Sequence, residues 1–204
     1  MKNLKATVID ACYNTQVRRF SNITAICEEL ENYEAKSCNL DEINKAINNI
    51  QKNADKSCFS FLTKYFALHR RYDENYEKLP IYDKYVQEYI NAFYSTKGIK
   101  GKFKDTDKKA ENAYEKFYKC MEKILEEENE GIKENEKLNF SDLDNKIWFC
   151  AKLIRIILNS SEKNLENLEF NIKDENNKNN YKLAYFKKIL EQEKNEKIKK
   201  QKNN

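Results

Sequence analysis

Apolar residues recur along much of this chain three and four positions apart, which is the period of one face of an α-helix. The clearest stripe lies within residues 40–53. Asn39 and Glu42 begin it with the spacing of a capping box, in which each side chain bonds to the other residue's backbone. Further stripes predict helices over 61–68, 82–94, 106–129 and 141–158. Ser60 is the predicted N-cap of the helix over 61–68, and Ser141 is the predicted N-cap of the helix that ends at 158. The helix that carries Trp148 is the most apolar, and we expect it to be the most deeply buried.

The two ends of the chain have weaker patterns. Residues 6–33 predict two short helices with an interruption near Ser21 and Asn22. Residues 159–180 are polar and predict an irregular connection, and residues 181–204 begin amphipathically and become a charged tail that should fray. We therefore predict one helical domain over 1–160, followed by a polar linker and a charged C-terminal helix or tail over 161–204.

The residues that make turns are scarce. The chain has 204 residues but only three glycines and one proline, and sheets need such residues at their hairpins. Pro80 and the pair Gly98 and Gly101 mark two loops between predicted helices. The expected fold class is therefore all-α, a multi-helix globular domain with a frayed charged C-terminal helix.

Composition adds little to this picture. Hydrophobic residues make up 40% of the chain, which is enough for a folded core despite 35% charged residues. The many Asn, Lys, Ile and Tyr residues are typical of an AT-rich genome, so runs of Asn and Lys are not by themselves functional. The formal net charge of +4 is compatible with a nucleic-acid partner without requiring one.

Cysteines and histidine give no pattern of a metal or cofactor site. The six cysteines are scattered with no CxxC pair, and His69 is the single histidine. We read the cysteines as reduced, mostly buried residues of a reducing compartment, and expect no metal and no cofactor. No secretion signal and no membrane-spanning stretch is recognisable, so we expect an intracellular, cytoplasmic protein without a membrane partner.

One segment has a recognisable motif. Residues 60–69 read Ser-Phe-Leu-Thr-Lys-Tyr-Phe-Ala-Leu-His, and residues 79–86 read Leu-Pro-Ile-Tyr-Asp-Lys-Tyr-Val. Lys64 lies near the start of one predicted helix and Asp83 at the start of the next, 19 residues later. A lysine near a helix start or removed from water loses its proton more easily, and a carboxylate is favoured at a helix N-terminus. These are suitable positions for an amine nucleophile and a stabilising anion.

In this motif the chain resembles the helix-hairpin-helix DNA glycosylases, in particular proteins with the 8-oxoguanine DNA glycosylase fold, over roughly residues 40–95. The resemblance implies a helical domain of that type, with Lys64 as the nucleophile and Asp83 as its electrostatic partner. It also implies removal of a damaged or modified base from DNA, accompanied by lyase activity. The chain departs from the family at Ser60 and Leu62, where the family has glycines that approach a DNA phosphate.

Further residues around the motif are candidates for contact with DNA or with a flipped base. Aromatic residues near the motif can stack on the base, and basic side chains can contact phosphates. The candidates are Ser60, Thr63, Tyr65, His69, Arg70, Tyr82, Lys97, Lys100 and Lys102. Ordinary structural roles are open for these residues and for Asp83 as well. His69 can be a helix-terminal or core group, Asp83 a helix cap, and the loop with Lys97, Lys100 and Lys102 a solvated surface.

Two other functions remain open at this point. The chain can be a non-catalytic interaction or regulatory protein, for example one involved in host-virus conflict, that keeps the fold without the chemistry. It can also bind DNA or RNA without sequence preference through its basic loop and tail. A protein partner and the oligomeric state are likewise left open by the sequence.

Overall fold

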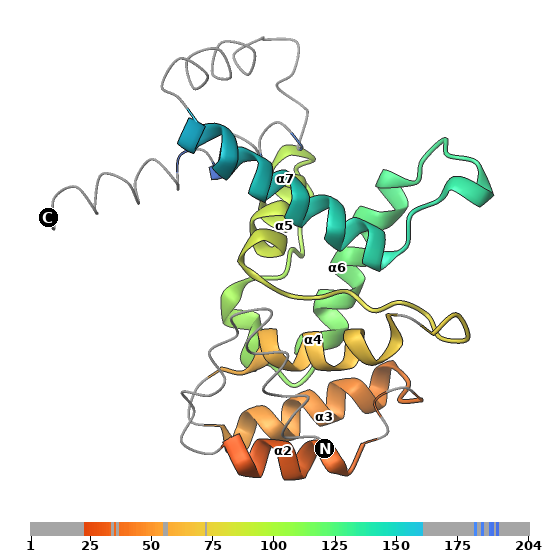
Figure 1. The fold of residues 1–204 in the computed structure, drawn as a ribbon. Helices are drawn as coiled ribbons and strands as arrows, with labels where there is room; N and C mark the ends of the chain where they lie inside the picture. The colour runs from red at the N-terminus through yellow and green to blue at the C-terminus, as the bar shows by residue number, and fades with distance from the viewer. Residues whose placement is uncertain are drawn as a thin grey trace, which may run out of the picture. The chain divides into compact units, whose positions relative to one another are not determined.

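The computed structural model describes residues 23–33, 35, 37–54, 57–71, 73–160, 182, 185, 188, 189 and 191. Every secondary-structure element in this part of the chain is helical, which confirms the all-α prediction (Figure 1). None of the helices in it is long and apolar enough to span a bilayer. The elements are α2 (Ile23–Glu31), α3 (Leu40–Asn53), α4 (Phe59–Arg70), α5 (Lys84–Thr96), η2 (Asp105–Lys109), α6 (Ala113–Glu128), η3 (Glu134–Glu136) and α7 (Phe140–Ser160), where η denotes a 3₁₀ helix.

The chain divides into two compact units. Unit 1 comprises residues 1–83 and 103–142, and unit 2 comprises residues 84–102 and 143–204. Unit 1 therefore holds α2, α3, α4, α6 and both 3₁₀ helices. Unit 2 holds α5 and, from Leu143 onward, α7. A single helical domain over 1–160 with an appendage over 161–204 stays a prediction.

Helix α3 lies at the centre of unit 1 and packs against α2, α4 and α6. Figure 1 shows α2, α3 and α4 stacked one upon another. The predicted capping box starts α3: the Asn39 side chain accepts from the Glu42 N–H at 2.9 Å, and the Glu42 carboxylate accepts from the Asn39 N–H at 2.7 Å. The helix ends at Asn53 as predicted, and its apolar stripe is buried, namely Ile43, Ala46, Ile47 and Ile50.

An aromatic cluster fills the core of unit 1 and ties α4 to α6. It consists of four buried rings, each in contact with the other three at centroid distances of 5.3 to 6.0 Å. Such pairs add about 0.5–1.5 kcal/mol each beyond the burial of their area. The cluster therefore fixes α4 against the residues that follow it along the chain. Its members are Phe59, Tyr82, Phe103 and Phe117.

Helix α4 begins at Phe59, two residues earlier than predicted. Cys58 occupies the N-cap position and makes no side-chain cap bond, so Ser60 as N-cap is wrong. Ser60 lies inside the helix, because its hydroxyl donates to the backbone carbonyl of Tyr82 instead. Tyr82 in turn lies outside α5, which begins at Lys84 and not at residue 82. The N–H and the carbonyl of Tyr82 are both hydrogen-bonded to side chains of α4, just before α5 begins.

The predicted long helix over 106–129 is wrong in its first third. Residues 105–109 form η2, and α6 begins only at Ala113. The cause is a row of amide side chains on α3, Asn44, Asn48 and Gln51, which we call the amide row. Its NH₂ groups donate to the carbonyls of residues 108 and 111, and Asn44 Oδ1 accepts from the Tyr114 N–H at 3.1 Å. In a continuous helix the Tyr114 N–H would instead donate to the Ala110 carbonyl.

The core of unit 2 forms around α5. Its predicted apolar face is buried, namely Val86, Tyr89, Ile90 and Phe93. The Tyr185 ring lies 5.0 Å from the Tyr89 ring, and the Tyr185 hydroxyl donates to the carbonyl of Ile147 on α7 at 3.3 Å. Lys188 forms an ion pair with Glu88 at 2.9 Å. Tyr185 therefore contacts both α5 and the Ile147 side of α7, and Lys188 is paired with α5.

Helix α7 differs most from its prediction. Asn139 caps it, accepting from the N–H groups of Ser141 and Asp142, so Ser141 as N-cap is wrong. Trp148 as a core residue is also wrong, since it is 50% exposed. The helix is apolar on more than one face, but among its residues up to 153 only the face of Leu143, Ile147 and Ala151 is buried. A hydrophobic pattern alone does not show which face of a helix packs against another part of the protein.

The remaining predictions concern loops, cysteines and chain ends. Gly98 and Gly101 adopt positive φ angles of 65° and 87° in the predicted basic loop, a conformation that favours glycine. The cysteines within the described residues are free, and all but Cys150 are buried. Cys12, the helix predicted within 6–21, the irregular segment beyond Ser160 and most of the C-terminal tail lie outside the described residues.

Candidate functional site

Lys64 lies in the second turn of α4 and is buried. Only 3% of it is exposed, and its ammonium group donates to the Ser60 hydroxyl at 3.1 Å, one helical turn earlier. Thr63, beside it, is completely buried. This turn of α4 therefore faces the interior of unit 1.

Two hydroxyl groups of α4 hold the chain segment that ends at Asp83. The Ser60 hydroxyl donates to the Tyr82 carbonyl at 2.9 Å, and the Tyr82 N–H donates to the Thr63 hydroxyl at 3.0 Å. Because Ser60 also accepts from Lys64, a chain of two hydrogen bonds connects the Lys64 ammonium to the Tyr82 carbonyl. Asp83 is the next residue and directly precedes α5. The structure thus brings Lys64, Ser60 and Thr63 together with the residue that precedes Asp83.

Tyr82 belongs to the aromatic cluster and its ring is enclosed by it. Its hydroxyl donates to Asp105 Oδ1 at 2.5 Å, and the Lys108 ammonium lies 4.4 Å from its ring centroid. The hydrogen bond from Tyr82, and then the one from Lys108, hold the pKa of Asp105 below its ordinary value. Tyr82 acts here as a link between the core and η2.

The next turns of α4 carry three more predicted site residues. Tyr65 is buried, burial raises the pKa of its hydroxyl, and its ring lies 4.4 Å from the His69 ring. His69 Nδ1 lies 2.7 Å from the Tyr65 carbonyl oxygen. Arg70 is buried, donates to the carbonyl of Cys38 and lies over the ring of Tyr76 at 5.7 Å. Arg70 therefore ties α4 to the start of α3.

The basic loop belongs to unit 2 and is described separately. Lys97 and Lys100 are exposed there, and Lys102 is half-buried. The predicted site residues thus fall into three groups: the Lys64 turn with Tyr82 and Asp83, the Tyr65 to Arg70 turns, and this loop.

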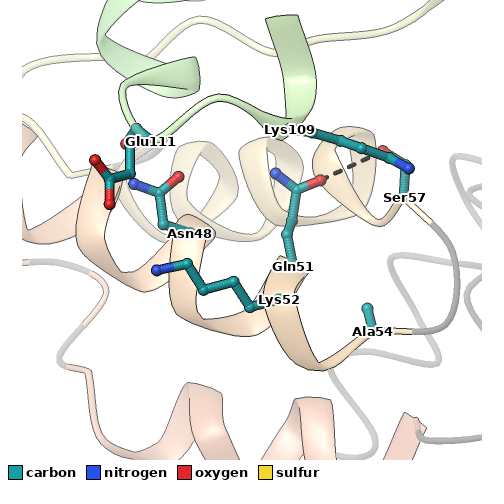
Figure 2. Close-up of a pocket in the computed structure, with 7 residues that line it drawn as sticks. All are labelled: Asn48, Gln51, Lys52, Ala54, Ser57, Lys109 and Glu111. Atoms are coloured by element: carbon teal, nitrogen blue, oxygen red, sulfur yellow. Dashed lines mark hydrogen bonds between the residues drawn. The ribbon is translucent and has the colours of Figure 1, made fainter. Parts of the chain in front are cut away.

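A pocket of about 360 Å³ lies beside the amide row of α3, and the sequence patterns did not predict it. Figure 2 shows its residues, which come from α3, from the connection after it, from the end of η2 and from the segment that follows η2. Gln51 Oε1 accepts from the Ser57 hydroxyl there at 3.3 Å. Two ammonium groups and one carboxylate make the lining polar and charged. The residues are Asn48, Gln51, Lys52, Ala54, Ser57, Lys109 and Glu111.

Within the residues that the structure describes, no group of three or more His, Cys, Asp or Glu side chains is placed to hold a metal ion. No protein-family model matches the chain, and neither a curated protein nor a solved structure is significantly similar to it.

Proposed function

We propose that the Lys64 turn and Asp83 form a base-excision site of the helix-hairpin-helix DNA glycosylase type. The observation that carries this proposal is the hydrogen-bonded chain from Lys64 through Ser60 to Tyr82, next to Asp83. It supports the proposal because a nucleophile and its electrostatic partner must be held in one region by their surroundings, although they are 19 residues apart in the sequence.

The proposed reaction uses the two side chains in different roles. The neutral Lys64 amine attacks the sugar C1′, the bond from C1′ to the base nitrogen breaks, and the base leaves with that electron pair and takes up a proton. Opening of the sugar ring and loss of the amine proton give an imine between Lys64 and C1′. The Asp83 carboxylate stabilises the positive charge that develops at C1′ before the new bond is complete. Water then releases the lysine, or elimination breaks the strand first.

The burial of Lys64 supports a second function. At 3% exposure its ammonium serves as an internal hydrogen-bond donor, and a substrate reaches it only if the surrounding side chains move. On this observation the protein is a non-catalytic binding or regulatory protein that uses the same hydrogen bonds to hold α4 against residues 80–83.

Borohydride trapping decides between the two functions. The protein is incubated with duplexes that carry 8-oxoguanine, uracil or an abasic site, and the imine is reduced to a stable adduct. We expect an adduct with the wild type and with Lys45→Ala, an exposed lysine of α3, and none with Lys64→Ala. Asp83→Asn should slow adduct formation about 10²-fold.

One further measurement is the control for this result. Lys64→Met keeps most of the side-chain volume, and its urea midpoint shows whether loss of the adduct reflects loss of the fold. A folded wild-type protein that gives no adduct with any of the three duplexes overturns the glycosylase proposal in favour of the binding function.

A further inference from the structure

Three apolar side chains on α7 are exposed. Trp148 is 50% exposed, Phe149 62% and Leu153 39%. We call them the aromatic face of α7. Scattered exposed apolar residues are ordinary, but a cluster with two aromatic rings on one helix is typical of an interaction site.

Tyr185 lies on another side of this helix. Tyr185 bonds to the carbonyl of Ile147, which belongs to the buried face of α7 together with Leu143 and Ala151. Trp148 and Phe149 follow Ile147 in the helix and point about 100° and 200° away from it around the axis. The residues that cover the Ile147 side therefore leave the aromatic face exposed.

Charge identifies the kind of partner. The sequence from residue 145 to residue 161 contains Lys146, Lys152 and Arg155 and no acidic residue. The Lys152 ammonium lies 5.1 Å from the Trp148 ring centroid, so a positive charge accompanies the aromatic face directly. A complementary partner is anionic and presents flat or apolar groups between its charges.

The net charge of unit 2 as a whole is also positive. Unit 2 contains 18 basic and 10 acidic side chains, a formal net charge of +8, whereas unit 1 contains 20 basic and 24 acidic side chains, a net charge of −4. The excess does not depend on the C-terminal tail, since residues 84–102 and 143–160 alone hold seven basic and two acidic side chains. The aromatic face thus belongs to the basic part of the molecule.

We propose that the aromatic face of α7 binds single-stranded nucleic acid, with bases stacked on Trp148 and Phe149 and phosphates contacted by Lys152. Unpaired bases have exposed flat faces that accept aromatic side chains, and the phosphates between them supply the negative charge. A second copy of this chain fits less well, because a symmetric contact brings together two surfaces that each carry an excess of basic residues, with Asp144 as the one acidic residue of α7 after Leu143. This site is separate from the Lys64 turn and binds without chemistry.

Trp148 is the single tryptophan of the chain, so its fluorescence reports on this site alone. Bases stacked on an indole quench its emission, whereas transfer into a lipid or protein surface shifts the emission to shorter wavelength. We expect saturable quenching when a 15-residue oligothymidylate is added to the full chain. Quenching should persist in Lys64→Met, which separates this result from that of the trapping experiment.

Fluorescence anisotropy of a labelled oligothymidylate measures the affinity of variants. Trp148→Ala and Phe149→Ala should each weaken binding about tenfold, as expected for loss of one stacked base. Lys152→Gln should lower the slope of log affinity against log salt by about 0.7. Lys123→Gln, an exposed lysine of α6 in unit 1, is the matched control and should change neither quantity.

Three outcomes overturn the proposal. The first is no binding of the oligonucleotide, and the second is binding that Trp148→Ala, Phe149→Ala and Lys152→Gln leave unchanged. The third is a shift of Trp148 emission to shorter wavelength with phosphatidylserine vesicles, or with rising protein concentration, without quenching by the oligonucleotide. That result identifies a membrane surface or a second copy of the chain as the partner.

Discussion

Phe117 on α6 and Phe149 on α7 are the same residue type in the middle of two amphipathic helices, yet one is fully buried and the other is 62% exposed. In unit 1 the aromatic residues gather into a closed cluster, and the net charge around them is negative. In unit 2 two aromatic side chains of α7 stay on the surface, and the net charge is positive. The comparison shows that the four rings of the aromatic cluster are enclosed in the core of unit 1, whereas Trp148 and Phe149 of unit 2 stay in contact with solvent although other aromatic residues of that unit are buried.

The largest expected effect tests this contrast directly. Phe117→Ala removes one ring from a cluster in which every ring touches the other three, so we expect the free energy of unfolding to fall by about 3–5 kcal/mol. Phe149→Ala should change it by no more than about 0.5 kcal/mol, because the side chain is already in water. Urea unfolding of both variants measures the difference. Similar losses in the two variants would contradict the assigned division of roles.

The second effect concerns the polar bonds that hold unit 1 together. Asn44→Ala leaves the Glu111 carbonyl and the Tyr114 N–H without their bonds to Asn44, and we expect a loss of about 1–3 kcal/mol in unfolding free energy. Asn49→Ala, on the exposed side of α3, removes one 3.3 Å bond to the Tyr33 hydroxyl and is the matched control. Its effect should stay within about 0.5 kcal/mol. An equal loss in both variants would mean that the amide row does not determine the start of α6.

The smallest effect is electrostatic and depends on pH. The pKa of Asp105 is lowered in the folded state by its bonds to Tyr82 and Lys108, so its stabilising contribution is present above the unfolded value of about 3.9. The contribution is lost as the pH falls through the lower, folded pKa. Asp105→Asn should therefore cost less than about 1 kcal/mol at pH 7, since the carboxylate is largely exposed, and the difference from wild type should shrink toward pH 2. Urea unfolding at several pH values, with Glu122→Gln as the control, measures it. A difference that is constant with pH would exclude this linkage.

The sequence predicted those features whose causes are local. The boundaries of α3 follow from Asn39 and Glu42 and from a single apolar stripe, and both are confirmed. The loop at Gly98 and Gly101 follows from residues that readily adopt positive φ. In each case the determining atoms lie within a few residues of one another.

The sequence could not predict features that depend on distant partners. The late start of α6 depends on Asn44, 70 positions away from Tyr114. The position of Ser60 inside α4 depends on Tyr82, 22 positions away. The exposure of Trp148 depends on which face of α7 is covered, and hydrophobicity does not encode that choice. For the candidate site, the sequence named Ser60, Thr63, Lys64 and Tyr82, which are linked by hydrogen bonds, but it did not indicate the burial of Lys64.

The bond from Asn44 to the start of α6 also has a consequence for how unit 1 opens. Because the side chain that caps α6 belongs to α3, the first turn of α6 keeps this protection from hydrogen exchange only while the two helices are docked. Closing the intervening loop of nearly 70 residues is an entropic cost that has to be met before this cap can form. We therefore expect the start of α6 and the middle of α3 to lose their protection from hydrogen exchange together.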